Sequence, residues 1–181
     1  LYKKLDKKKT FINIIINNAA NNYSPSLNMT ENWQNDLDVI LLGAKNIIEV
    51  FIKKIIIKRN GNIINIGSDL SIIAPDQRIY KDIKNFIKPL SYSVAKHGIV
   101  GLTKYYASLL GNKNIRCNCL SPAGVYNNQN LKFKKKLENL IPLGRMAKKD
   151  EYNKVINFLC SDGSSYMTGH NLVMDGGRSI I

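Results

Sequence analysis

Tyr92 and Lys96 lie four residues apart in the stretch Tyr92-Ser93-Val94-Ala95-Lys96. On a helix this spacing puts both side chains on one face, one turn from each other. A nearby ammonium favours the phenolate form and lowers the pKa of a phenol from about 10. Such a phenol can give or take a proton, so the two residues are a candidate acid–base centre. Taken alone, the pattern also fits an ordinary solvated helix face.

Three other polar segments each follow a candidate strand. Asn17-Asn18-Ala19 follows residues 11–16, Ser68 follows residues 62–66, and Ser121-Pro122-Ala123-Gly124 follows residues 115–120. In open parallel sheets, ligands bind beyond the carboxyl ends of the strands. A serine hydroxyl on such a support can orient a carbonyl oxygen. Each segment alone could equally be a turn or a helix cap, but together they converge on the edge that Tyr92 would face.

The elements that would position these groups alternate along the chain. Runs rich in β-branched residues predict strands at 11–16, 62–66, 115–120 and 171–174. Apolar residues at helical spacing predict helices over 30–58, with Thr30 as the N-cap, over 92–110, and near 150–160. We therefore expect an α/β fold, a Rossmann-like parallel sheet with helices on both faces, in which strand 11–16 is buried on both sides. Segments 71–89 and 126–139 are predicted to be a loop over the strand ends and a polar flap.

Composition limits the class of protein. The chain has 181 residues, 44% of them hydrophobic, and a formal net charge of +14, which fits one domain over 1–181. The charge permits a basic nucleic-acid-binding protein as an alternative, but the lysines are spread out, with short runs such as Lys7-Lys8-Lys9, and lack interleaved aromatic residues. No apolar run is long enough to cross a membrane. Cys117, Cys119 and Cys160 are interpreted as small buried residues in a cytoplasmic protein, and no metal site is expected.

Taken in order, these motifs resemble those of the short-chain dehydrogenase/reductase family. Asn17-Asn18-Ala19-Ala20 is similar to the family's N-N-A-G, Gly67-Ser68 to its catalytic serine, and Tyr92 with Lys96 to its Y-x-x-x-K. Ser121-Pro122-Ala123-Gly124 is similar to its P-G motif. The likeness extends from about residue 11 to the C-terminus through three further segments, which are Pro142-Leu143-Gly144-Arg145, Phe158-Leu159-Cys160-Ser161-Asp162, and Thr168-Gly169 with Asp175-Gly176-Gly177.

The resemblance implies hydride transfer between NAD or NADP and a small-molecule carbonyl or alcohol. Tyr92 would be the general acid or base, Ser68 would hold the substrate oxygen, and Lys96 would lower the pKa of Tyr92 and bind the nicotinamide ribose. The implied cofactor-binding residues are Asn18, Ala19, Tyr92, Lys96, Pro122, Gly124 and Val125. It also implies a homo-oligomer, a tetramer or dimer, when the protein is full length.

The sequence departs from the family pattern in its first part. No G-x-x-x-G-x-G loop precedes Asn17, and the family's first three strands have no counterpart. We therefore expect a C-terminal piece of a longer protein, or alternatively an inactive remnant or half-domain that binds no dinucleotide. Ile40 stands where the family often has asparagine, which removes one side chain of the usual Ser-Tyr-Lys-Asn set. The choice between NAD and NADP, the substrate and the reaction direction stay open.

A weaker resemblance concerns the substrate. Residues 74–80, 127–130 and 142–146 are similar to a branch found in surface-sugar and flagellin-modification pathways. This resemblance implies a polar substrate such as a sugar or sugar nucleotide. Arg78, Asn127 and the lysines of residues 132–136 are then the candidate substrate-binding residues, the cations for contact with phosphate.

Overall fold

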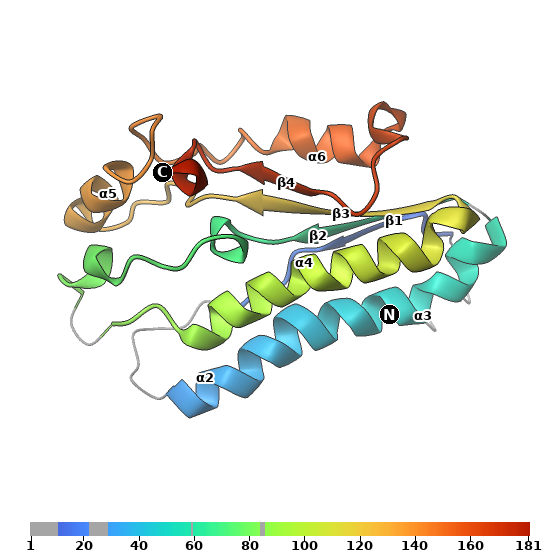
Figure 1. Ribbon diagram of the computed structural model, residues 1–181, viewed down its shortest axis with the longest axis horizontal. Helices are drawn as coiled ribbons and strands as arrows, with labels where there is room; N and C mark the ends of the chain where they lie inside the picture. Colours follow the sequence, from blue (N-terminus) through green and yellow to red (C-terminus); the bar gives the residue numbers. More distant parts are fainter. Residues whose placement is uncertain (1–10, 22–28, 59, 84–85) are drawn as a thin grey trace.

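Four parallel strands form the centre of the molecule (Figure 1). The structure, a computed structural model, describes residues 11–21, 29–58, 60–83 and 86–181. The strands are β1 (Ile14–Asn17), β2 (Gly61–Ile66), β3 (Ile115–Pro122) and β4 (Asn171–Met174), and they pair in the order β1-β2-β3-β4. All pairs are parallel, so the carboxyl ends of the strands meet at one edge of the sheet. The predicted parallel α/β sheet is confirmed.

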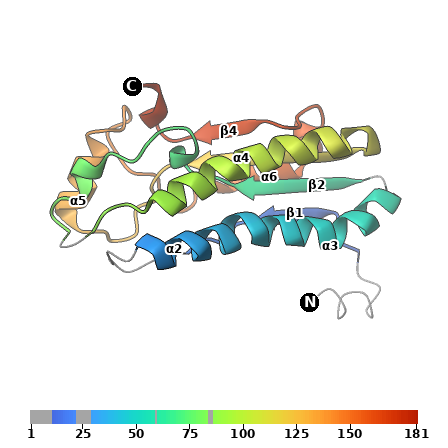
Figure 2. The same ribbon diagram turned by 60° about the horizontal axis from the view of Figure 1, so that its bottom comes forward.

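Helices cover both faces of this sheet (Figures 1 and 2). The helices α2 (Met29–Asp36), α3 (Gly43–Lys58) and α4 (Leu90–Leu110) lie on one side, and α6 (Asn153–Cys160) lies on the other. Side chains of a strand alternate between its two faces. Ile63 accordingly joins the core that packs against α3 and α4, whereas its neighbour Ile64 joins Leu159 of α6 on the opposite face.

The first strand differs from its prediction. Only Ile15 is buried, at 6% exposure, whereas Ile14 and Ile16 are 37% and 44% exposed. Among the described residues β1 pairs with β2 alone, so one of its edges and part of its faces carry no neighbour. The expectation that segment 11–16 is buried on both faces is wrong in the part of the chain that the structure describes.

The helical segment 29–58 has its predicted extent to within one residue but is less regular than predicted. It begins at Met29, so Thr30 lies inside the helix and is not its N-cap. A π-helical turn over Leu37–Leu42 separates α2 from α3, and Ile40 in that turn is buried at 3% exposure. Single π-helical turns inside α-helices are often found beside functional sites. The position where the family often has asparagine thus lies at an irregular turn and points into the core.

The predicted polar flap contains a helix, α5 (Leu131–Glu138), that the sequence analysis did not predict. Asn130 caps it by accepting hydrogen bonds from the backbone N–H groups of Lys132 and Phe133. One face of α5 is apolar, and its Leu137 is buried against Ile79. The described residues of segment 71–89, all but 84–85, form a loop as predicted, with a short 3₁₀ turn over Gln77–Tyr80 that packs against α5.

Negative findings apply to the described segments only. No helix in those segments is long and apolar enough to cross a membrane, and no three potential metal ligands cluster there. Cys117 and Cys119 are buried free thiols, and Cys160 is a half-buried one. The basic run Lys7-Lys8-Lys9 lies outside the described residues.

Candidate active site

The predicted catalytic residues meet at the carboxyl ends of β2 and β3, where α4 begins. Ser68 follows β2, and Tyr92 lies in the first turn of α4. Both residues line one open pocket of about 230 Å³, together with the loop that leaves β3 and residues of α5. The remaining lining residues are Gly67, Asp69, Leu70, Tyr80, Lys88, Pro122, Ala123, Gly124, Val125, Gln129, Phe133, Leu137, Met146 and Arg178.

Close packing of β2 against β3 fixes the backbone before Ser68. A Cβ atom on Gly67 would lie 2.6 Å from Ser121 Oγ and 2.9 Å from Cys119 Sγ, so only glycine fits there. The Ser68 hydroxyl accepts a hydrogen bond from the backbone N–H of Leu70 at 3.1 Å and donates to Asp69 Oδ1 at 2.8 Å. Ser68 is therefore held as a cap of the following turn, with its hydroxyl in the pocket.

The phenol of Tyr92 is half-buried at the pocket. Burial raises its pKa above the usual value, and a hydrogen bond with Ser68 acts in the opposite direction. The net shift is opposite in direction to the sequence-based expectation, and a lowering contribution from Lys96 stays a prediction. Burial is the larger effect, and Tyr92 therefore stays protonated at neutral pH.

Lys96 turns its ammonium to the backbone of β2. Its Nζ donates to the carbonyl oxygen of Ile66 at 2.7 Å and lies 5.7 Å from the centre of the Tyr92 ring. Burial, with a smaller contribution from the positive charge of Lys88, lowers the pKa of Lys96 to about 8. The structure brings Lys96 beside the site, although it does not line the pocket among the described residues.

Residues predicted to hold the cofactor divide into two groups. Pro122, Gly124 and Val125 line the pocket through the loop after β3. Asn18 and Ala19 lie just beyond β1 at the same edge of the sheet, but both are exposed and neither lines the pocket.

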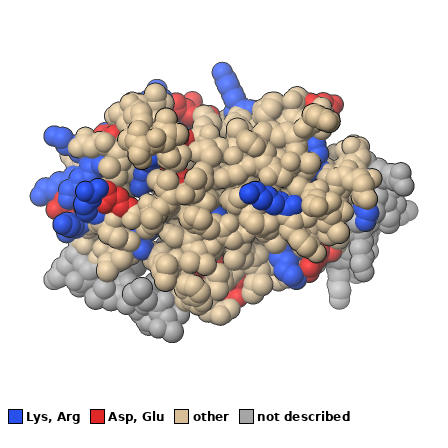
Figure 3. Space-filling model, in the orientation of Figure 1, with Lys and Arg blue, Asp and Glu red and all other residues tan. Residues whose placement is uncertain are grey.

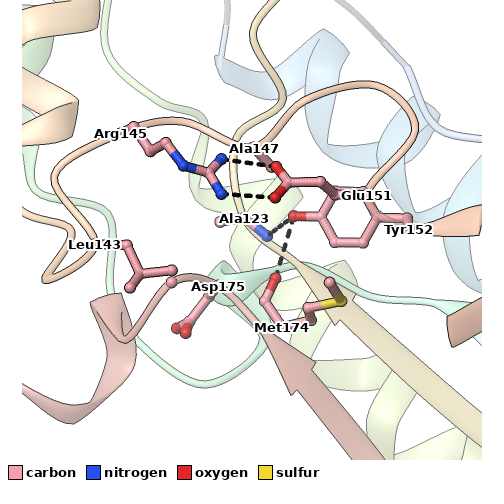
Figure 4. A pocket seen from close by; sticks show the side chains of 9 residues that line it. Ala123, Leu143, Arg145, Ala147, Glu151, Tyr152, Met174 and Asp175 are labelled. Atoms are coloured by element: carbon pink, nitrogen blue, oxygen red, sulfur yellow. Dashed lines mark hydrogen bonds and ion pairs between the residues drawn. The ribbon is translucent and has the colours of Figure 1, made fainter. Parts of the chain in front are cut away.

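A second set of contacts supports the loop after β3 from behind (Figure 4). The backbone N–H of Ala123 donates to Tyr152 Oη at 3.1 Å, and the Tyr152 hydroxyl donates to the carbonyl oxygen of Met174 at 3.1 Å. Arg145 pairs with both carboxylate oxygens of Glu151, at 2.6 and 2.7 Å. These groups line a cavity of about 80 Å³, and their mutual bonding makes them a support for the active-site loop.

The two predicted substrate-binding residues lie away from the pocket. Arg78 is bound to Asp76, with 2.7 Å between Nη2 and Oδ2, and lines a neighbouring hollow. Asn127 is exposed and uses its backbone N–H to donate to Gln129 Oε1. The structure therefore does not bring either side chain to Ser68 and Tyr92.

Sequence reasoning missed several residues that do line the pocket. Lys88 lies four residues before Tyr92, and this short separation could have indicated that the two side chains lie close together. Arg178 gave no local signal, because it reaches the pocket from 109 positions away to pair with Asp69. Tyr80 lies in the 3₁₀ turn and Gln129 lies two residues before α5, and neither the turn nor the helix was predicted.

Positive charge at the surface is uneven (Figure 3). On the face shown, Lys and Arg gather at the end of the molecule formed by α5 and are separate elsewhere. Lys134 pairs with Glu138 and Lys136 pairs with Asp82, each at 2.7 Å. Part of this charge is thus neutralised within the protein.

Comparison with known proteins identifies the family to which the chain belongs. A family model described as enoyl-(acyl carrier protein) reductase matches residues 1–179. The chain is 32% identical to the 3-oxoacyl-(acyl-carrier-protein) reductase FabG of Thermotoga maritima over 98% of its length, and 30% identical to a human 3-oxoacyl-(acyl-carrier-protein) reductase over 99%. It spans 70% and 72% of those two proteins, and 66% of FabG from Chlamydia trachomatis. The chain belongs to the short-chain dehydrogenase/reductase family.

Solved structures show the same fold. A short-chain dehydrogenase from Leptospira borgpetersenii with bound NAD+ superposes with a TM-score of 0.89 at 31% identity, over 98% of this chain and 69% of that one. A 4-hydroxyisoleucine dehydrogenase complexed with NADH superposes with a TM-score of 0.84 at 25% identity, over 99% and 74%. The predicted family and the Rossmann-like fold are confirmed.

Proposed function

We propose that this protein is an NAD(P)-dependent oxidoreductase that transfers hydride between the nicotinamide and a carbonyl or alcohol substrate. The observation that carries the proposal is the meeting of Ser68 and Tyr92 in one pocket beside Lys96, in a chain of the short-chain dehydrogenase/reductase family. These residue types at this strand edge suit acid–base work on an oxygen atom.

Tyr92 is the proposed proton donor in reduction. Its raised pKa keeps the hydroxyl protonated at neutral pH, so the proton is available to a carbonyl oxygen on which negative charge develops. In the reverse direction the same oxygen would take the proton of an alcohol. Ser68 would donate a second hydrogen bond to that oxygen by turning its one hydroxyl proton away from Asp69 Oδ1, and such donors stabilise charge most where water is excluded.

NAD or NADP, when bound, would supply or accept the hydride. We propose that Pro122, Gly124 and Val125 hold its nicotinamide end through their backbone, with Lys96 at the ribose and Asn18 and Ala19 nearby. The fit is supported at Gly124, where an added Cβ would lie 3.0 Å from Leu137 Cδ2 and 3.2 Å from Met146 Cε. A larger residue would thus crowd these two side-chain ends, which form part of the pocket wall.

The substrate is a small molecule with a carbonyl or alcohol group. The relatives named above include 3-oxoacyl-(acyl-carrier-protein) reductases and a 4-hydroxyisoleucine dehydrogenase. A sugar or sugar nucleotide is our narrower proposal, and it rests on the weaker resemblance of residues 74–80 and on the polar side chains of Tyr80, Lys88 and Gln129 in the pocket. We place the reaction in the cytoplasm.

We also propose that the protein is a homo-oligomer. Large apolar side chains are exposed on the helices α3 and α4, among them Ile47, Val50, Tyr105 and Leu109 at 39% to 63% exposure. Apolar side chains of this size on adjacent helices suit a face shared with a second copy of the chain. Sedimentation at increasing concentration tests this, and a monomer at micromolar concentration would contradict it.

An inactive half-domain is the second candidate, and the position of Asn18 and Ala19 outside the pocket favours it. The deciding experiment measures binding of NADH and NADPH to the native protein by fluorescence, followed by turnover with acetoacetyl thioesters and with sugar nucleotides. The oxidoreductase proposal expects binding and oxidation of at least one dinucleotide. Absence of binding to both would support the half-domain.

A further inference from the structure

A second ammonium group lies at the proposed acid–base residue. Lys88 precedes α4 by two positions, and its Nζ lies 3.7 Å from the centre of the Tyr92 ring. This distance is well inside the range of about 6 Å in which a cation interacts with an aromatic face. The same side chain lines the pocket that holds Ser68.

The backbone of Lys88 is held in place. The side-chain amide of Gln77 donates to the Lys88 carbonyl oxygen at 3.2 Å and accepts from the Lys88 N–H at 3.0 Å. Gln77 itself opens a 3₁₀ turn that Asp76 caps. Pro89 follows Lys88 and fixes its own φ angle. Lys88 is therefore a positioned residue of the pocket wall, unlike a lysine on a free surface loop.

The charge of Lys88 has no carboxylate partner among the described residues. The buried carboxylate of the pocket, Asp69, is already paired with Arg178, and Asp36 accepts a hydrogen bond from Ser91. Burial lowers the pKa of Lys88, with the charges of Asp36 and Asp69 acting in the opposite direction. The cations Lys88, Lys96 and Arg178 outnumber the carboxylates Asp36 and Asp69, so the region around Tyr92 has an excess of positive charge while the lysines are protonated.

We propose that Lys88 recognises a negatively charged group, a carboxylate or a phosphate, that the substrate carries close to its reacting carbonyl or alcohol carbon. The inference rests on the proposed function, because it assumes that the substrate oxygen sits at Tyr92. Since Nζ lies over the ring of that residue, the charged group and the reacting carbon belong to the same small part of the substrate. An ammonium bound to a carboxylate or phosphate forms a charge-assisted hydrogen bond, which is stronger than a neutral one.

The test compares Lys88→Met, which keeps the apolar stem and removes the charge, with Lys88→Arg and with the matched control Lys104→Met on the exposed side of α4. Substrates are acetoacetate, its neutral methyl ester and acetonyl phosphate. Lys88→Met is expected to lower kcat/KM for the charged substrates by about 10- to 100-fold more than for the ester. Lys88→Arg is expected to retain most of the activity, and Lys104→Met all of it.

Binding of malonate and of inorganic phosphate, followed by NMR shifts, gives a readout that needs no turnover. Tighter binding of malonate indicates a carboxylate substrate, and tighter binding of phosphate indicates a phosphorylated one. Both should weaken at least about tenfold in Lys88→Met. Equal losses on the acid and the ester, or unchanged anion binding, would overturn the inference. Tyr92→Phe separates this inference from the proposed function. If Tyr92→Phe leaves turnover intact while anion binding still depends on Lys88, the proposed function fails and the anion site stands.

Discussion

At the scale of single residues, the site depends on how burial shifts the pKa values of Tyr92 and Lys96. Lys96 has a pKa lowered to about 8, mainly by burial, so its ammonium is lost as the pH rises through that value. In the unfolded chain the amine keeps its proton up to about 10.5. The unfolded state therefore binds more protons between about pH 8 and 10.5, and the contribution of Lys96 to stability rises with pH across that window.

We predict that one lysine of the folded protein titrates near pH 8. The measurement is an NMR titration of lysines labelled at the carbon next to Nζ, and the resonance should vanish in Lys96→Arg. If all resonances titrate above about pH 10, as unperturbed lysines do, burial of Lys96 is weaker than its surroundings imply.

Ser68 gives a second prediction at this scale. Ser68→Ala is expected to lower kcat by about 10²- to 10³-fold, the usual cost of losing one donor to a developing negative charge. Ser68→Thr keeps a hydroxyl and should restore a substantial part of the rate. A Ser68→Ala enzyme as active as the native protein would show that the hydroxyl serves only as the cap of the turn at Leu70.

At the scale of elements, the first turn of α4 must be held in place, because Tyr92 lies in that turn at the edge of the sheet. The anchor is Ser91, whose hydroxyl donates to the fully buried carboxylate of Asp36 at 2.6 Å. Two positions later, the buried hydroxyl of Ser93 has no hydrogen-bond partner among the described residues. The two serines thus differ in bonding while sharing a helix and a degree of burial.

We therefore predict that Ser91→Ala lowers the free energy of unfolding by about 1–3 kcal/mol, because Asp36 loses a partner in a buried place. Ser93→Ala should be neutral or slightly stabilising, since it removes an unsatisfied hydroxyl. Urea denaturation of both variants decides the matter. Equal effects would mean that the bond from Ser91 to Asp36 does not anchor α4.

The elements also show how far the sequence could predict this structure. The strands and α4 carry long apolar runs or helical spacing, so β2, β3, β4 and the helix of Tyr92 were predicted within two residues or so. The helix α5 was missed because its turns carry many lysines and only Phe133 and Leu137 show its apolar face. Phe133 and Leu137, which line the pocket from α5, were missed for the same reason.

At the scale of the whole molecule, one buried ion pair closes the C-terminus onto the site. Arg178 donates to Asp69, and their side chains are 7% and 5% exposed. No local pattern could predict this contact, because pairs far apart in sequence are created by the fold. Removing one partner of a buried pair leaves an uncompensated charge.

Arg178→Met is accordingly expected to lower the free energy of unfolding by about 3–5 kcal/mol. Arg78→Met, which breaks the exposed pair with Asp76, should change stability little. Thermal and urea unfolding of the two variants give the comparison. Similar small losses in both would indicate that the pair at Asp69 is solvated in the working protein.

The central claim is that the Tyr92 hydroxyl transfers the proton, and exchange of that one oxygen tests it most directly. Turnover of the native protein with its preferred dinucleotide is compared with Tyr92→Phe and with Tyr166→Phe, whose ring is fully exposed. We predict that Tyr92→Phe loses at least about 10²-fold in kcat, while Tyr166→Phe keeps the native rate and both variants remain folded. A Tyr92→Phe protein that turns over at the native rate would contradict the account.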